Sequence, residues 1–273
     1  MSQAVMQTAS SVSLAFDSIA ERYDELFTQS LIGRAQRRVV WNELARSFSP
    51  FDHVLELNCG TGEDALFLAR RGVSVLACDA SSAMIDVAQR RLASEAPQAN
   101  LQFQVLSNEG LNKLRSPVRF DGAFSNFSGL NCVEDILPIA QNLGKLVRSN
   151  GRLILCVSSR FCVWETLWFL CHANARKAFR RISGHTVAHI DGMAIPVWYP
   201  TIRHLRRTFA PWFQLRSIRA VGLLVPPSYL ESQVRGRSNV IAFLEKMDNL
   251  LAGLPLLRCV GDHVLLNFER VPS

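Results

Sequence analysis

The 273-residue chain lacks several features that would place it in other classes of protein. Its seven cysteines are an odd number with no Cys-x-x-Cys pair, which argues against a disulfide framework and a zinc cluster. No N-terminal segment has the basic flank and apolar run of a signal peptide, and the apolar stretch at residues 161–171 is interrupted by Glu165. No internal repeat or low-complexity tract is present. We therefore expect a soluble, cytoplasmic protein without a metal site.

Lysine is also scarce, because arginine outnumbers it 26 to 4. Residues 160–237 contain 12 Lys or Arg against three acids, a balance of +9, while the whole chain carries +7. The same span holds four of the five tryptophans. With 48% hydrophobic residues the chain can bury a large core, so the sequence predicts one main domain that carries a basic, aromatic-rich insertion.

Residues 54–69 are the most informative stretch, since they read as a buried strand, a glycine turn and a helix start. Gly60 and Gly62 have no Cβ, so the backbone can turn sharply and lie against a ligand. Asn58 tolerates a left-handed backbone. The next predicted strand ends in Asp79, which is placed to accept hydrogen bonds from ribose hydroxyls. This order predicts a nucleoside-binding unit.

One feature argues against a dinucleotide. Dinucleotide-binding loops usually carry a third glycine three residues after the second, for close packing beneath a pyrophosphate. In this chain that position is Ala65, and Asn58 replaces the first glycine. The pyrophosphate interpretation is weakened accordingly.

Further motifs follow in an order typical of one family. They are Ala15-Phe-Asp-Ser-Ile-Ala-Glu-Arg-Tyr-Asp24, Glu56-Leu-Asn-Cys-Gly-Thr-Gly62, Cys78-Asp-Ala-Ser-Ser-Ala-Met-Ile-Asp-Val-Ala88, Phe120-Asp-Gly-Ala-Phe-Ser-Asn-Phe127 and Leu146-Val-Arg-Ser-Asn-Gly-Arg-Leu-Ile-Leu155. Over residues 15–157 the chain resembles the class I S-adenosylmethionine (SAM)-dependent methyltransferases, which is more specific than one glycine loop.

The resemblance implies roles for individual residues. Glu56 would orient the amino group of the SAM methionine moiety, and Asp79 would hold the ribose. The acid that usually reads the adenine amino group is missing, and its place falls on Ser107 or Asn108. The implied cofactor contacts are Tyr23, Glu56, Asn58, Cys59, Gly60, Gly62, Asp79, Ala80, Met84, Ser107, Asn108, Glu109 and Asn126.

Several of these residues have a purely structural alternative. Glu56 and Asp79 could form surface ion pairs, but an acid flanked by apolar strand residues is costly to bury without a partner, which favours function. Met84 is as readily a core residue as a cofactor wall, and Tyr23 could simply pack its helix.

The predicted fold is α/β: a doubly wound, seven-stranded, mostly parallel sheet whose last strand is antiparallel, with helices on both faces and a lid insertion after the fifth strand. In the lid we expect a helix over residues 160–182 and a hairpin that turns at Asp191-Gly192. The expected segments are a disordered tail (1–12), a SAM-binding core with an N-terminal cover helix (13–159), the basic and aromatic lid (160–212) and C-terminal strands that complete the sheet (213–273).

An insertion at this point would lie over the carboxyl edge of the sheet, where the methyl group must be delivered. Candidate catalytic residues are His189 and Tyr199, which flank the hairpin, and Asn126 after the fourth strand. A single histidine in such a segment is more often a packing or surface residue than a base. The aromatic residues expected to contact substrate from the lid are Trp164, Trp168, Trp198, Tyr199 and Tyr229.

The predicted function is transfer of a methyl group from SAM to a small amphiphilic or aromatic acceptor by in-line displacement, leaving S-adenosylhomocysteine. RNA is an alternative acceptor, although the chain has no recognisable RNA-binding module and no Lys-rich stripe. A membrane surface is a third partner, because the 161–182 segment has tryptophan on one face and basic residues at its end. A solvated Arg-rich surface, a non-catalytic SAM-binding protein and an NAD-linked oxidoreductase are the remaining alternatives.

Overall fold

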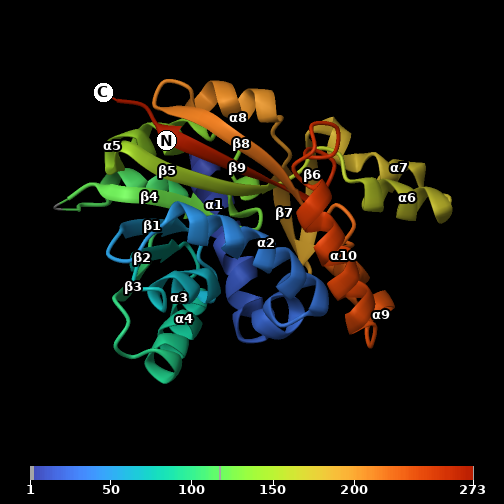
Figure 1. The fold of residues 1–273 in the computed structure, drawn as a ribbon, viewed down its shortest axis with the longest axis horizontal. Helices are drawn as coiled ribbons and strands as arrows, with labels where there is room; N and C mark the ends of the chain where they lie inside the picture. Colours follow the sequence, from blue (N-terminus) through green and yellow to red (C-terminus); the bar gives the residue numbers. More distant parts are fainter. Residues whose placement is uncertain (1–2, 117, 273) are drawn as a thin grey trace.

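The computed structural model describes residues 3–116 and 118–272, and its main body is a seven-stranded sheet in the order β3-β2-β1-β4-β5-β9-β8 (Figure 1). Adjacent strands from β3 to β5 run parallel, while β9 is antiparallel to both β5 and β8. The predicted doubly wound sheet with an antiparallel last strand is confirmed. The strands are β1 (His53–Leu57), β2 (Ser74–Asp79), β3 (Leu101–Val105), β4 (Phe120–Ser125), β5 (Val147–Ser158), β6 (His185–Ile190), β7 (Met193–Trp198), β8 (Phe213–Val221) and β9 (His263–Arg270).

Helices cover both faces of the sheet. Helices α2, α3 and α4 bury Val40, Leu66 and Ile85 in one cluster, whereas α5 and α8 bury Leu143 and Phe209 in a cluster on the other face (Figure 1). The α-helices are α1 (Gln3–Ile19), α2 (Leu31–Ser47), α3 (Glu63–Ala69), α4 (Ser82–Glu95), α5 (Leu137–Leu146), α6 (Val163–Cys171), α7 (Ala175–Ala178), α8 (Ile202–Phe209), α9 (Glu231–Val234) and α10 (Ser238–Leu251). Short 3-10 or π turns are η1 (Ala20–Arg22), η2 (Asp24–Thr28), η3 (Asn108–Lys113), η4 (Gly129–Cys132), η5 (Arg180–Ser183) and η6 (Ser228–Leu230). None of the helices in the described ranges is long and apolar enough to cross a membrane.

Two sequence-based expectations for helices are corrected. Residues 3–12 belong to helix α1, where a disordered tail was expected, and Val12 on this helix lines the cavity described below. Residues 1–2 of that tail lie outside the described residues. The single helix expected over 160–182 is broken into α6, α7 and η5, because Ala173 adopts a left-handed backbone (φ 53°) and Asn174 caps a new helix through the Lys177 N–H.

The hairpin predicted within the insertion is observed as β6 and β7. It turns at Asp191 and Gly192, which both have positive φ (48° and 81°), the conformation that a two-residue hairpin turn requires. Its tip reaches the N-terminal helices, since Ile190 packs with Ile19 and Met84 and Asp191 pairs with Arg22 (3.6 Å).

A buried ion-pair cluster fixes the insertion to the core. The Arg181 guanidinium donates to Glu165 on α6 (2.7 Å) and to Asp262 just before β9 (2.9 Å), and all three side chains are buried. Burial would raise the pKa of Asp262, but His263 and Arg181 hold it below its ordinary value. The cluster therefore joins segments that are far apart in the sequence.

Candidate functional site

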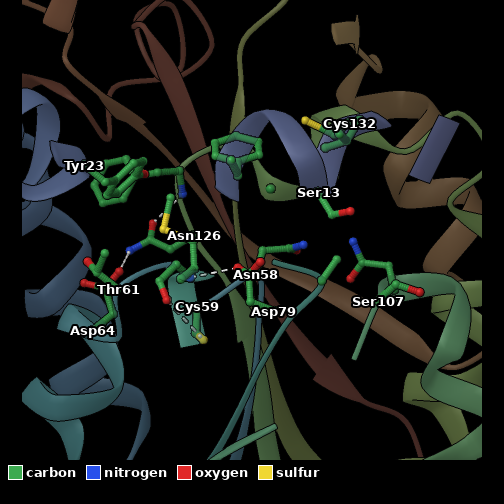
Figure 2. Close-up of a pocket in the computed structure, with 18 of the residues that line it drawn as sticks. Ser13, Tyr23, Asn58, Cys59, Thr61, Asp64, Asp79, Ser107, Asn126 and Cys132 are labelled. Atoms are coloured by element: carbon green, nitrogen blue, oxygen red, sulfur yellow. Dashed lines mark hydrogen bonds between the residues drawn. The ribbon is translucent and has the colours of Figure 1, made fainter. Parts of the chain in front are cut away.

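A cavity with an empty volume of about 910 Å³ lies at the carboxyl edge of the four parallel strands β1 to β4. Each of these strands contributes one lining residue, either its last residue or one that follows it within two positions. These residues are Asn58, Asp79, Ser107 and Asn126. In Figure 2, Asp64 and Asn126 lie toward one end of the cavity, Ser107 lies toward the other, and Asp79 lies between them. Ligands of open α/β sheets bind at this edge.

The glycine loop after β1 has the backbone conformation that its sequence predicts. Asn58, Gly60 and Gly62 have φ angles of 57°, 52° and 77°. A Cβ on Gly60 would meet only Tyr23, at 3.9 Å, on the cavity side, whereas a Cβ on Gly62 would lie 2.6 Å from the Phe103 ring. Gly60 therefore keeps the backbone open to the cavity. Gly62 leaves room for Phe103 of β3 and Ala88 of α4, and it does not itself line the cavity.

The carboxylate of Asp79 is held in place at the end of β2. It accepts the N–H of Gly60 (2.8 Å) and the N–H of Ser81 (2.9 Å), and it lines the cavity. Burial raises the pKa of Asp79, although these backbone donors act in the opposite direction. The predicted ribose acid is thus positioned by the loop that would surround the cofactor.

Glu56 lies behind the loop and outside the cavity wall. Its side chain is 1% exposed, and its Oε2 atom has no hydrogen-bond partner among the described residues. Burial raises the pKa of this carboxyl well above its ordinary value, and the nearby Asp64 raises it further. A buried acceptor without a donor is costly, so the site fits a ligand that brings a cation, as the amino group of SAM does.

Asp64, in the first turn of α3, was not a sequence-based candidate, yet it organises one end of the cavity. Its carboxylate accepts hydrogen bonds from Trp41 Nε1 (2.6 Å) and Asn126 Nδ2 (2.8 Å) and pairs with Arg37 Nη1 (2.6 Å). An acid at a helix N-terminus normally stabilises the helix dipole, which conceals a second role in the sequence.

Arg37, on α2, is the second residue that the sequence did not identify. Its guanidinium lines the cavity while being buried, it stacks on Phe127 (4.8 Å), and its Nε has no partner among the described residues. Burial acts to lower the pKa of Arg37, but Asp64 raises it, so the group stays cationic. The one signal in the sequence is an arginine among the apolar positions of the buried face of α2.

Helix α1 and the turn after it cover the cavity. Asp17 fixes α1 to the start of α4 by accepting hydrogen bonds from Ser81 Oγ (2.6 Å) and Ala83 N (3.1 Å). Burial raises the pKa of Tyr23 to about 12, so this phenol stays protonated. The predicted cover helix is present and begins earlier than expected. The covering residues are Val12, Ser13, Phe16 and Tyr23.

The opposite end of the cavity is built by the residues predicted to contact adenine. Ser107, Asn108 and Glu109 line it at the start of η3, together with Ala80. Met84 lines the cavity and also packs with Ile19 and Ala20, so it is a core residue at the cavity wall, and its contact with the cofactor stays a prediction. The remaining predicted lining residues that the structure places here are Tyr23, Asn58, Cys59, Gly60, Asp79 and Asn126.

Two catalytic candidates do not lie in the cavity wall. Ile190 faces the α1 cluster, and because side chains alternate along a strand, His189 points to the other face and is exposed. Tyr199 is buried against the Arg181 guanidinium (5.6 Å), and burial raises its pKa, which makes the phenol a poor base. Asn126 is the candidate that lines the cavity.

The aromatic residues predicted to contact substrate also lie elsewhere, because they stabilise the insertion itself. Trp164 donates to the Leu224 carbonyl (2.8 Å), Trp168 packs in the cluster around Ile32, Trp198 packs on His185, and Tyr229 stacks on Phe169. The cavity cover comes from α1 and not from these side chains.

Comparisons with known proteins agree with this geometry. Residues 54–151 match the family model of a methyltransferase domain. The chain is 30% identical over 152 residues to demethylmenaquinone methyltransferase from Thermobifida fusca, covering 56% of this chain and 63% of that protein. It is 28% identical to tRNA 5-carboxymethoxyuridine methyltransferase from Escherichia coli K12, covering 51% and 54%. The chain thus spans less than two thirds of these relatives.

The fold is shared with solved structures. An S-adenosylmethionine-dependent methyltransferase from Mesorhizobium loti superposes with a TM-score of 0.54 at 15% identity, covering 86% of this chain and 98% of that one. The match over residues 54–151 and the sheet order are those of a Rossmann-like methyltransferase domain. These similarities agree with the predicted family and with SAM as its cofactor.

Proposed function

We propose that the protein transfers the methyl group of SAM to a small amphiphilic or aromatic acceptor. The observation that carries the proposal is the cavity at the carboxyl edge, which combines polar groups suited to the cofactor with an apolar wall. That wall includes Val12, Phe16, Phe127 and Val133. A cavity of this composition suits a flat or apolar molecule beside the cofactor.

Three side chains that line the cavity, together with Glu56 behind the glycine loop, would hold SAM. Arg37 would pair with the methionine carboxylate, Glu56 would accept from its ammonium group, and Asp79 would accept from the ribose hydroxyls. Ser107, at the far end, would hydrogen-bond the adenine edge. This assignment gives the unpartnered atoms of Glu56 and Arg37 a donor and an acceptor, respectively.

When bound, SAM supplies a methyl group already activated on a sulfonium, so the protein needs mainly to align the acceptor and exclude water. Asn126 is suited to this positioning. Its carbonyl accepts the Phe127 N–H (3.0 Å) and one amide hydrogen goes to Asp64, which leaves the second amide hydrogen for a ligand.

The acceptor would bring its own nucleophile. The described residues that line the cavity include no histidine, and the Tyr23 phenol has a pKa of about 12. Of the carboxylates that line it, Asp64 is engaged by three donors, Asp79 by two backbone N–H groups and Glu63 by Arg91. Glu109 lies at the opposite end, with the residues predicted to contact adenine. A general base is needed only where the acceptor is weakly acidic. We therefore favour an acceptor whose nucleophile is an acidic phenol, an enol or an activated carbon atom. This choice is in keeping with the quinone in the name of the Thermobifida relative.

RNA is the second candidate acceptor, because another relative is named as a tRNA methyltransferase and the 160–237 span is basic. A third outcome is SAM binding without transfer. The cavity is partly lined by apolar side chains and is covered by α1, unlike an open basic groove for nucleic acid. The small acceptor is therefore preferred.

Calorimetry with SAM, S-adenosylhomocysteine and NAD tests the cofactor assignment, and tight NAD binding without a response to SAM would refute it. Isotopically labelled SAM, incubated with an extract of small metabolites or with total tRNA, then separates the acceptors. Label in the small-molecule fraction supports the proposal, label in tRNA supports the alternative, and binding without label in either indicates a non-catalytic protein.

A further inference from the structure

Helix α6 buries its polar side chains and exposes leucines, the reverse of the usual pattern of a surface helix. Its two polar side chains, Glu165 and Thr166, are 1% and 7% exposed, whereas Leu167 and Leu170 are 56% and 44% exposed. A surface helix normally buries its apolar stripe and presents its polar face to water. The outer face of α6 is therefore suited to an apolar environment.

Helix α10 repeats this arrangement. Asp248 is buried, where its carboxylate accepts the backbone N–H groups of residues 223–225. Phe243 and Leu250, seven residues apart on one side of the helix, are 60% and 72% exposed, and Val240 is exposed one turn earlier. Two helices thus place an acid inside and large apolar side chains outside.

The two helices lie at the same end of the molecule. Trp168 of α6 packs in one cluster with Ile241 and Leu244 of α10, and Figure 1 shows α6, α7, α9 and α10 together at one end of the molecule. Contiguous exposed apolar patches mark interaction sites. The α6–α10 face is defined by Leu167, Leu170, Val240, Phe243 and Leu250.

The segment of the chain that carries this face is basic, although Arg203, Arg206 and Arg207 belong to α8 and not to the face itself. Residues 163–260 contain 13 Lys or Arg and five acids. Each of these acids is engaged within the protein: Glu165 by Arg180 and Arg181, Asp191 by Arg22, Glu231 by the N–H groups of Leu31 and Ile32, Glu245 by Arg38, and Asp248 by backbone.

Basic side chains, in contrast, remain available next to the α6–α10 face. Arg176 and Lys177 on α7 and Arg235 and Arg237 before α10 are exposed, and none has a carboxylate partner within the described ranges. A second copy of the chain docked face to face would bring these like charges together, which disfavours self-association.

We propose that the α6–α10 face docks the protein onto a bilayer surface that contains anionic lipids. The exposed leucines and Phe243 enter the interface between headgroups and acyl chains, while Arg176, Lys177 and Arg235 reach the lipid phosphates. The inference concerns this surface alone and does not depend on the acceptor.

Flotation with vesicles of phosphatidylcholine, with and without phosphatidylglycerol, tests the proposal without SAM or acceptor. The wild type is expected to float with the anionic vesicles, and the double variant Leu167→Ser, Phe243→Ser to bind at least about tenfold more weakly. Phe51→Ser is the matched control, because Phe51 is 94% exposed in the loop before β1, at the opposite edge of the sheet. Circular dichroism checks that each variant is folded.

The double variant Arg176→Gln, Lys177→Gln separates the electrostatic contribution. We expect it to bind phosphatidylglycerol vesicles about tenfold more weakly and with a shallower salt dependence. The proposal would be overturned if the wild type did not float, or if the double variant Leu167→Ser, Phe243→Ser floated as well as the wild type and the Phe51→Ser control. A wild-type dimer that these substitutions dissociate would also overturn it, as would a tRNA affinity that they abolish in place of vesicle binding.

Discussion

Replacing Glu56 with glutamine removes a buried charge while keeping the shape of the side chain. In the ligand-free protein the Glu56 carboxyl is 1% exposed, its Oε2 is unpartnered, and burial raises its pKa well above 4.5. A raised pKa means that the folded state prefers the protonated form. The contribution of Glu56 to stability is therefore complete below pH 4.5 and declines as the pH rises toward the folded pKa.

Glu56→Gln should have opposite effects on the stability of the ligand-free protein and on its affinity for SAM. At pH 8 Glu56 is ionised in the unfolded wild type, whereas the folded state disfavours that charge, and glutamine removes this penalty. The free energy of unfolding of the variant should therefore exceed that of the wild type by about 1–3 kcal/mol, the cost of an unsatisfied buried polar group. At pH 5 the difference should shrink. SAM binding should instead weaken by about 1.5–3 kcal/mol, the range for a hydrogen bond to a charged group, or roughly 10- to 100-fold in Kd.

Urea denaturation of the ligand-free proteins at pH 5 and pH 8, together with calorimetric titration of SAM at pH 8, measures both effects. A variant that binds SAM as tightly as the wild type, or one equally destabilised at both pH values, would contradict the assignment of Glu56 to the ammonium group.

Two further substitutions test other parts of the structure. Asp79→Ala should weaken SAM binding by about 1–3 kcal/mol in calorimetry, whereas Asp86→Ala, an exposed acid on α4, should leave it unchanged; unchanged affinity for both would remove Asp79 from the ribose site. Arg181→Met leaves Glu165 and Asp262 buried without their shared partner and should lower the free energy of unfolding by about 3–5 kcal/mol in a denaturant titration, and a loss below about 1 kcal/mol would show that the cluster is not structurally important.

The sequence predicted the parts of the site that are formed by local motifs. The left-handed Asn58, the open Gly60 and the placement of Asp79 depend on backbone conformation within a few residues, so their signatures are contiguous. The hairpin turn at Asp191-Gly192 was predictable for the same reason. Each of these features needs little information from distant parts of the chain.

The residues that the sequence missed, or placed wrongly, depend on long-range packing. Arg37 and Asp64 meet because α2 and α3 lie on the same face of the sheet, which no spacing rule specifies. His189 is turned away from the cavity because its neighbour Ile190 packs on α1. The sequence assigns the tryptophans of the insertion to the substrate, because it cannot show that Trp164 donates to the distant Leu224 carbonyl or that Trp168 packs in the cluster around Ile32.

Trp41 connects the candidate site to a spectroscopic signal. Its indole N–H donates to Asp64, the same carboxylate that pairs with Arg37 at the cavity wall, and its ring stacks on Phe67 at 4.3 Å. It is also the one tryptophan of the chain outside residues 160–237. A ligand whose carboxylate draws Arg37 away from Asp64 changes the electrostatic field at the indole. The fluorescence emission of Trp41 therefore reports occupancy of the cavity, and a Trp41→Phe variant is the control for this signal.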